Sequence, residues 1–253
     1  MQNVQVPRMT AWRTPIFLPA AFFLRLFHLP YTSIYHTKVL TRRESLLRSY
    51  KFTSPNPLRV SEGAKGEVLC YYVKMKILVG LGNPGEEYEN TRHNTGRIVV
   101  SMIEKKWGSE NEKQKIKFLM PDTFMNNSGR AVAPLVKSKK DLKDLVVVYD
   151  DIDLPLGKMK ISFNRSSGGH NGLGSIIKSL KSQEFTRIRI GIASVTPSGK
   201  IKKPKGKKAV INFILGEFKK PELEILKKLS KKITEAVEVI FSEGKDKAMS
   251  MYN

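Results

Sequence analysis

The chain has 253 residues and a formal net charge of +22, with 45 Lys and Arg against 23 Asp and Glu. Its apolar content of 40% is enough for the core of one large domain or two small ones. The charge favours an anionic partner such as nucleic acid, although a surface that is simply basic would have the same composition. The single cysteine, Cys70, excludes an internal disulfide and a zinc cluster. No apolar run reaches the roughly 18 residues that a membrane span needs.

Residues 1–74 differ in composition from the rest of the chain. They contain no Asp and only three Glu, against eleven Lys and Arg. Such an acidic-poor segment suggests an organelle transit sequence for a mitochondrion or a plastid. The apolar stretch 17–29, which Arg25 interrupts, leaves a two-part plastid-type signal open. If the segment is instead an unselected extension upstream of a start at Met75, the protein is cytoplasmic. We therefore assign 1–74 as a leader, either targeting or disordered, and 75–253 as the folded domain.

From Met75 onward, the pattern of apolar residues predicts one α/β domain. The run 145–149 is apolar throughout, which is typical of a central strand covered on both faces. We therefore predict three layers, with a mixed, mostly parallel twisted sheet flanked by helices. In chain order, we expect a strand at 76–81, a helix from Thr95 that stops at Gly108, a strand at 115–120, a helix after Asp122, strands at 145–149 and 158–163, a helix capped by Asn171, a strand at 187–193, and a helix that opens at Pro221 and stops at Gly244.

Two of the predicted strands, 158–163 and 187–193, alternate between apolar and basic residues. Because alternate side chains of a strand point to opposite faces, the basic residues are expected on the outer face. These residues are Lys158, Lys160, Arg187 and Arg189. The segment 200–208 has six lysines among nine residues and is predicted to be a flexible basic loop. It would be either a solvated linker or a contact to RNA phosphates that carries no sequence information.

Polar side chains follow several of these strands and turns. The strand at 76–81 runs into a glycine-rich turn that contains Asn83, and His93 follows. The strand at 145–149 runs into Asp150. In open α/β sheets, ligands bind at the carboxyl ends of the strands. A His, an Asp and three Asn, each beside a glycine turn or a strand end, therefore predict a hydrolytic site. The three amides are Asn83, Asn126 and Asn171.

Two other kinds of site fit parts of this pattern. The glycine-rich turn matches the Gly-x-Gly-x-x-Gly fingerprint of dinucleotide binding, but Glu86 and Glu87 stand where the pyrophosphate would lie. The carboxylates after the strand 145–149 offer oxygen ligands for Mg²⁺, but neighbouring residues of a strand point to opposite faces. An Asp that orients a histidine is the better use of one of them. These carboxylates are Asp150, Asp151 and Asp153.

Five longer motifs occur in order along the chain: Ile-Leu-Val-Gly-Leu-Gly-Asn-Pro-Gly-x-x-Tyr-x-x-Thr-Arg-His-Asn, Thr-Phe-Met-Asn-x-Ser-Gly, Asp-x-x-Asp-Leu-Pro-x-Gly, Gly-Gly-His-Asn-Gly-Leu and Phe-x-Arg-Ile-Arg-Ile-Gly-Ile. With these motifs, the chain from about Lys76 to the final helix resembles the bacterial-type peptidyl-tRNA hydrolase family. The resemblance implies a monomeric esterase without a metal, a cofactor or an obligate protein partner, which releases tRNAs trapped on peptides after aborted translation. It also implies His93 as the base, Asp150 as its partner, the three amides along the cleft, and Tyr88 and Phe124 at the tRNA 3′ end.

Elementary chemistry agrees with this hypothesis. The ester that joins a peptide to a ribose is already activated, so a water deprotonated by His93 is a sufficient nucleophile, and general-base help gives roughly 10²–10⁴-fold. Amide side chains can donate to an oxyanion and accept from N–H groups. The basic residues of the two alternating strands and the segment 200–208 would hold the acceptor stem by its phosphates. His170 is interpreted as a structural support of Asn171 rather than as a base.

One segment departs from the family pattern. His93 lies 33 residues before Asn126, which is shorter than the family spacing, and the missing piece would normally supply an edge strand. We therefore expect a sheet that lacks one edge strand, because 108–115 is too polar to replace it. The alternative function is a non-catalytic RNA-binding member of the same fold, similar to plastid proteins that assist intron splicing. The intact catalytic positions favour the enzyme.

Overall fold

The computed structural model describes residues 37–38, 58–62, 68–72, 75–108 and 115–253. By its internal contacts the chain divides into two units, residues 1–41 with 60–71 and residues 42–59 with 72–253.

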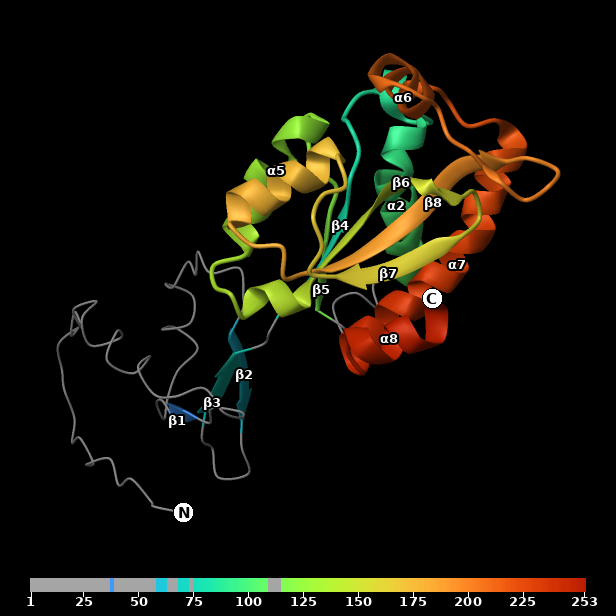
Figure 1. The fold of residues 1–253 in the computed structure, drawn as a ribbon. Coiled ribbons are helices and arrows are strands. Elements are labelled where there is room, and N and C mark those ends of the chain that lie inside the picture. Colours follow the sequence, from blue (N-terminus) through green and yellow to red (C-terminus); the bar gives the residue numbers. More distant parts are fainter. Residues whose placement is uncertain (1–36, 39–57, 63–67, 73–74, 109–114) are drawn as a thin grey trace, which may run out of the picture. The chain divides into compact units, whose positions relative to one another are not determined.

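Three short strands are described before Met75: β1 (Thr37–Lys38), β2 (Leu58–Glu62) and β3 (Val68–Tyr72). They form a sheet in the order β1-β3-β2, with β1 antiparallel to β3 (Figure 1). The predicted targeting leader falls mostly outside the described residues and stays a prediction.

The second unit is built on a mixed sheet (Figure 1). Its strands lie in the order β5-β4-β6-β8-β7, and β9 pairs with β8. β4 is parallel to both β5 and β6, and β6 is parallel to β8, whereas β7 and β9 run antiparallel to β8. The predicted mixed, mostly parallel sheet is confirmed. The strands are β4 (Lys76–Gly80), β5 (Ile116–Leu119), β6 (Leu145–Pro155), β7 (Met159–Phe163), β8 (Thr186–Val195) and β9 (Ile201–Lys202).

Helices cover both faces of this sheet. The α-helices are α2 (Thr95–Trp107), α4 (Ser128–Val132), α5 (Asn171–Leu180), α6 (Lys207–Leu215), α7 (Lys220–Ser242) and α8 (Lys245–Tyr252). The short 3-10 turns are η1 (Glu86–Tyr88), η2 (Arg92–Asn94), η3 (Met125–Asn127), η4 (Ala133–Leu135) and η5 (Asp141–Asp144). The helix predicted after Asp122 is broken into η3, α4 and η4. Pro134 contributes to the break, because its ring cannot donate the next helical hydrogen bond.

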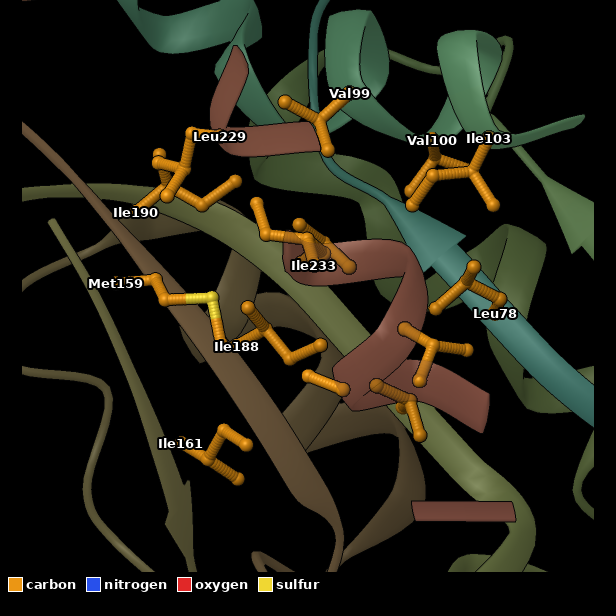
Figure 2. Close-up of a cluster of buried hydrophobic side chains, with 14 of the residues drawn as sticks. Leu78, Val99, Val100, Ile103, Met159, Ile161, Ile188, Ile190, Leu229 and Ile233 are labelled. Atoms are coloured by element: carbon orange, nitrogen blue, oxygen red, sulfur yellow. The ribbon is translucent and has the colours of Figure 1, made fainter. Parts of the chain in front are cut away.

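The alternation of β6 explains why its sequence is apolar throughout. Val146 and Val148 belong to a cluster with residues of α2, α7 and α8. Figure 2 shows part of this cluster, including Val99 and Ile233. Val147, on the other face, packs with residues of η3, α4 and α5. Each such side chain stabilises the fold by about 1.5–3 kcal/mol when it is fully buried. The sheet is therefore covered on both faces, and the predicted three layers are present.

Two glycines bring α2 close to the sheet. A Cβ atom at Gly96 would lie 2.2 Å from the Val148 carbonyl oxygen, and one at Gly80 would lie 2.5 Å from the Gly96 carbonyl oxygen. Only glycine at these positions allows the helix to pack directly on β4 and β6. The helix ends as predicted at Gly108, whose φ of 43° lies in the left-handed region. This close approach fixes the residues just before α2, which include His93.

β5 pairs with β4 at one edge of the sheet. Ile116, Phe118 and Met120 pack on the core cluster, as the alternation predicts. Within the described residues, no strand lies on the outer side of β5. The prediction that the sheet lacks an edge strand relative to the family stays a prediction, because residues 109–114 lie outside the described part.

The lysine-rich segment is more ordered than predicted. Residues 200–208 contain β9 and the first residues of α6, instead of one continuous loop. β9 exists because β8 extends to Val195 and pairs with Ile201. Among the described residues, no helix combines the length and the apolar character needed to cross a membrane.

Candidate active site

The carboxyl ends of β4 and β6 lie side by side, so the residues that follow them meet at one edge of the sheet. β4 ends at Gly80, which is opposite Val148 of β6. The turn after β4 carries Asn83, and the η2 turn carries His93 directly before α2. Asp150 lies two residues beyond Val148 on β6. The buried core thus positions the imidazole and the carboxylate that the sequence predicted.

His93 and Asp150 are in direct contact. Nδ1 of His93 lies 3.0 Å from Oδ1 and 3.1 Å from Oδ2 of Asp150. Both residues are buried, with exposed fractions of 6% for His93 and 4% for Asp150. Because a carboxylate only accepts hydrogen bonds, Nδ1 of His93 carries the proton and donates. Nε2 is then the basic nitrogen of the ring, as a general base requires.

The electrostatics of this pair suit a base. Burial lowers the pKa of His93, but the charge and the hydrogen bond of Asp150 outweigh it, so that this pKa is raised above its ordinary value. Burial raises the pKa of Asp150, but the charges of His93 and His170 and their hydrogen bonds hold it well below its usual range. Asp150 is therefore an anion that strengthens the basicity of His93.

His170 has contacts both with the start of α5, whose first residue is Asn171, and with Asp150, which was not expected from the sequence. Its Nε2 lies 3.0 Å from Asp150 Oδ1, and its Nδ1 accepts the N–H of Leu173 at 3.2 Å. His170, rather than Asn171, is thus the N-terminal cap of α5. The backbone donor fixes the tautomer, because Nδ1 must be unprotonated to accept it. Nε2 then donates to Asp150, which is held between two imidazoles.

Asn83 is fixed by three hydrogen bonds. Its Oδ1 accepts the N–H of Met125 at 2.8 Å. Its backbone N–H donates to Asn94 Oδ1 at 2.8 Å, and Asn94 Nδ2 donates to the Asn83 carbonyl at 2.9 Å. With Oδ1 engaged, Nδ2 is the group with which Asn83 can donate to a substrate. The role of Asn94 was missed, although it follows His93 directly in the first motif.

The remaining predicted residues of the cleft lie on the surface around these groups. The rings of Tyr88 and Phe124 form an edge-to-face pair with centroids 6.4 Å apart. Phe124 is 57% exposed, so that much of its ring is open to solvent. Asn126 and Asn171 are also exposed. Because Met125 lies between Phe124 and Asn126 and its N–H is bonded to Asn83, Phe124 and Asn126 lie close to Asn83.

A cavity of about 330 Å³ opens beside the two imidazoles. His93, Asp150 and His170 line it together with the loop that leads to α5, and Val210 and Ile214 of α6 line it as well. The walls combine convergent polar groups with apolar side chains, which is typical of a small-molecule or substrate site. α6 is thus part of the site, which the lysine-rich sequence before it did not indicate.

The four basic residues predicted on the outer face do not share one environment. Lys158 and Lys160 are exposed, as expected. Arg189 lines the cavity and pairs with Asp151, with its Nε 2.5 Å from Asp151 Oδ2. The prediction for Arg187 is wrong, because its exposed fraction is 0%. Its guanidinium donates to the carbonyls of Ser166 and Gln183 at 3.0 and 3.2 Å and lies over the Phe185 ring, 4.7 Å from the centroid.

The three carboxylates of β6 have three different partners. Asp150 binds the two histidines, Asp151 binds Arg189, and Asp153 binds Lys203. They therefore do not converge on one point, as a Mg²⁺ site would require. Among the described residues, His93, Asp150 and His170 are the group that could hold a metal ion, with ligand atoms within 4.8 Å of one another. Both histidines are hydrogen-bonded to Asp150, so the three side chains share protons with one another as an acid–base site does.

Comparisons with known proteins agree with the motifs. The family model of peptidyl-tRNA hydrolase matches residues 77–253. The chain is 40% identical over 197 residues to a peptidyl-tRNA hydrolase of Synechococcus sp., covering 72% of this chain and 84% of the relative. It is 43% identical over 186 residues to that of Fervidobacterium nodosum, covering 70% and 95%. The crystal structure of the Acinetobacter baumannii enzyme is 28% identical, covers 71% of this chain and 95% of its own, and superposes with a TM-score of 0.60. This chain therefore belongs to the peptidyl-tRNA hydrolase family.

Proposed function

We propose that this chain hydrolyses the ester bond between the peptide and the tRNA 3′ end in peptidyl-tRNA, and so recycles tRNA after aborted translation. The observation that carries the proposal is the contact of His93 with Asp150 at the cavity, where it leaves Nε2 of His93 as the base. Family membership and the matched motif positions support it. The intact pair also favours an enzyme over an RNA-binding protein without activity.

In the proposed mechanism, Nε2 of His93 takes a proton from a water molecule while the water oxygen attacks the ester carbonyl. Asp150 stabilises the imidazolium that forms, since it accepts the hydrogen bond of Nδ1–H throughout and stays an anion. When the tetrahedral intermediate collapses, the bond to the ribose oxygen breaks and the imidazolium returns the proton to that oxygen. The products are the free peptide acid and the tRNA with its hydroxyl. Such base catalysis contributes roughly 10²–10⁴-fold.

Amide groups around the base would stabilise the developing oxyanion. We propose Nδ2 of Asn83 as the donor, because the bond from Met125 to Oδ1 fixes the amide orientation. A donor that is held before the reaction does not have to reorganise during it. Asn126 and Asn171 would hold the peptide backbone at the exposed side of the site, where both amide ends are accessible.

The tRNA would bind across the exposed side of the same site. We propose that Tyr88 and Phe124 stack on the 3′ end, since base stacking on aromatic rings is tolerant of sequence. Lys158 and Lys160 and the lysines of 200–208 would contact phosphates. Arg189 would contribute charge at the cavity itself. Arg187 is buried and instead supports the strand.

The direct test is turnover of an N-acetylated aminoacyl-tRNA by the purified full chain. The unmodified protein should release the N-acetyl amino acid, and His93→Ala should abolish turnover while tRNA affinity stays nearly unchanged. The imidazole supplies the base and little of the binding charge. Equal loss of turnover and affinity would contradict the assignment of His93. Binding without turnover in the unmodified protein would favour the non-catalytic alternative.

For the first part of the chain, we propose that residues 1–74 direct the domain to a mitochondrion or a plastid. Their acidic-poor composition supports this, and the family match begins only at residue 77. A fluorescent protein fused behind residues 1–74 should be imported into one of these organelles. A uniformly cytoplasmic signal would contradict the proposal.

A further inference from the structure

Arg92 has a side chain that points away from its own turn. It precedes His93 in η2, and its guanidinium reaches the junction between α6 and α7, about 125 residues further along the chain. Nη1 donates to the Glu217 carbonyl at 2.6 Å, and Nη2 lies 3.0 and 2.9 Å from the two carboxylate oxygens of Glu222. Only 13% of the Arg92 side chain is exposed. Such charge-assisted bonds of a partly buried arginine are among the stronger polar contacts in proteins.

Aromatic rings complete the environment of this guanidinium. Its central carbon lies 5.0 Å from the ring centroid of Phe213, in α6, and 5.2 Å from that of Phe218, in the junction. Phe218 is buried in the main core cluster, and Phe213 packs against that cluster. The flat face of a guanidinium can stack on an aromatic ring while its N–H groups donate hydrogen bonds in the guanidinium plane. The ammonium group of a lysine has no such plane. Arg92 thus ties α6 to the core.

Backbone bonds join the same two segments. The N–H of Arg92 donates to the Gly216 carbonyl at 3.0 Å, and the N–H of Phe218 donates to the Asn90 carbonyl at 2.9 Å. Thr91 and Glu217 form an antiparallel bridge. The segment that carries His93 and the segment that ends α6 therefore run along each other, with the Arg92 side chain closing the contact.

α6, which Arg92 contacts at its carboxyl end, lines the cavity beside His93. Val210 and Ile214 of α6 form part of the cavity wall together with His93. None of the residues of α6 is fully buried, and its packing on the core comes from Phe213 and Ile214 near its carboxyl end. The position of the helix therefore depends strongly on the contacts at that end. A displacement of α6 would change the wall of the cavity in which the ester must lie.

We propose that Arg92 is a positioning residue for the reaction: its guanidinium fastens the carboxyl end of α6 to the segment that carries His93, so that the helix and the base keep one relative position. Arg92 touches neither Asp150 nor the cavity in this arrangement and acts through α6. An effect of Arg92 on kcat rests on the proposed function, whereas its effect on the position of α6 does not.

Arg92→Lys is the conservative test, because it keeps the charge but removes the planar fork and the stacking. In hydrogen exchange of the full chain, amides 207–215 should exchange at least about tenfold faster, while those of β6 stay unchanged. With N-acetylated aminoacyl-tRNA, kcat should fall about tenfold. The acidic limb of the pH–rate profile should stay at the same pH, because the contact of His93 with Asp150 is intact.

Arg97→Lys is the matched control. Arg97 also lies beside the site and binds one carbonyl and one carboxylate, at Pro121 and Asp122, but it makes no contact with α6. It should leave the exchange of 207–215 unchanged. Glu222→Gln should accelerate exchange of 207–215 less than Arg92→Lys does, and it provides a second variant if Arg92→Lys folds poorly.

The proposal is overturned if α6 exchanges at the original rate in Arg92→Lys, or if Arg97→Lys accelerates it equally. It is also overturned if the acidic limb moves while α6 is unaffected, because Arg92 would then act on His93 directly. If the unmodified chain has no hydrolase activity, the exchange experiment still decides whether Arg92 holds α6. A failure of the proposed function is thus distinguishable from a failure of this inference.

Discussion

The base and α6, which forms part of the cavity wall, are held in different ways. His93 is fixed by Asp150, which is 4% exposed and lies on a strand covered on both faces. α6 has no buried residue, and its firmest contacts are at its carboxyl end, around Arg92. His93 and Asp150 must keep a precise geometry for the reaction, whereas α6 must admit a large substrate. Variants that change one region should leave the other nearly unchanged.

The largest effect is expected where the core supports the base. Gly96→Ala should cost about 3 kcal/mol of unfolding free energy, because the new methyl group would lie 2.2 Å from the Val148 carbonyl oxygen. Thermal denaturation measures the loss. Gly174→Ala is the control, since its methyl group would find its nearest neighbour at 3.7 Å. It should be neutral or slightly stabilising. An equal loss in both variants would show that close packing of α2 is not what supports the site.

The next effect separates the two roles of His170. Asn is a good N-terminal cap, so His170→Asn should keep α5 capped while it removes the donor to Asp150. We expect kcat to fall about tenfold with a melting temperature close to that of the unmodified protein. His170→Ala should lower both quantities. If His170→Asn retains full kcat, the contact with Asp150 does not contribute to catalysis.

The basic residues allow a smaller and more selective change. Lys158→Ala with Lys160→Ala should raise KM, leave kcat unchanged and reduce the slope of the salt dependence by about one for each phosphate that the variant no longer binds. Arg187→Met should leave KM unchanged and destabilise the fold by about 1–3 kcal/mol, because the carbonyls of Ser166 and Gln183 lose their donor. A KM effect from Arg187→Met would mean that this arginine reaches the tRNA after all.

The smallest effect concerns the edge of the sheet. An insert of family length after Trp107 should raise the melting temperature slightly and reduce aggregation, because a strand would cover the outer side of β5. Central strands such as β4 should keep their hydrogen-exchange rates. If neither melting temperature nor aggregation changes, the account of a missing edge strand is wrong.

The sequence predicted the parts of the fold that depend on local pattern. The apolar run of β6, the alternation of Met159 and Ile161, and the glycine after α2 are all visible in a short window. The pairing of His93 with Asp150 was predicted from the family motifs and from the value of a carboxylate beside a histidine. The elements depend on residues whose environment is set by their own strand or turn, whereas the His93–Asp150 pair spans 57 residues and was predicted from the family motifs.

Apart from the His93–Asp150 pair, interactions between distant segments were not predicted. The alternation of β8 places Arg187 on the face opposite its isoleucines, but it does not show that Phe185 and the Ser166 carbonyl cover that face. The bond of Asn83 to Met125 spans 42 residues, and that of Arg92 to Glu222 spans 130. Local pattern contains no information about such pairs. The only available signal for His170 was its place just before a predicted helix, which is where caps occur.

The most direct test of the central claim is the pH–rate profile of Asp150→Asn. Asp150 raises the pKa of His93, and the base must be unprotonated to act, so the acidic limb of kcat/KM reports that pKa. Asn has similar shape but no charge. The account predicts that the limb moves to lower pH and that the plateau falls by at least about tenfold, because the weaker base loses its anionic partner. A profile with the limb and plateau of the unmodified protein would remove Asp150 from the mechanism.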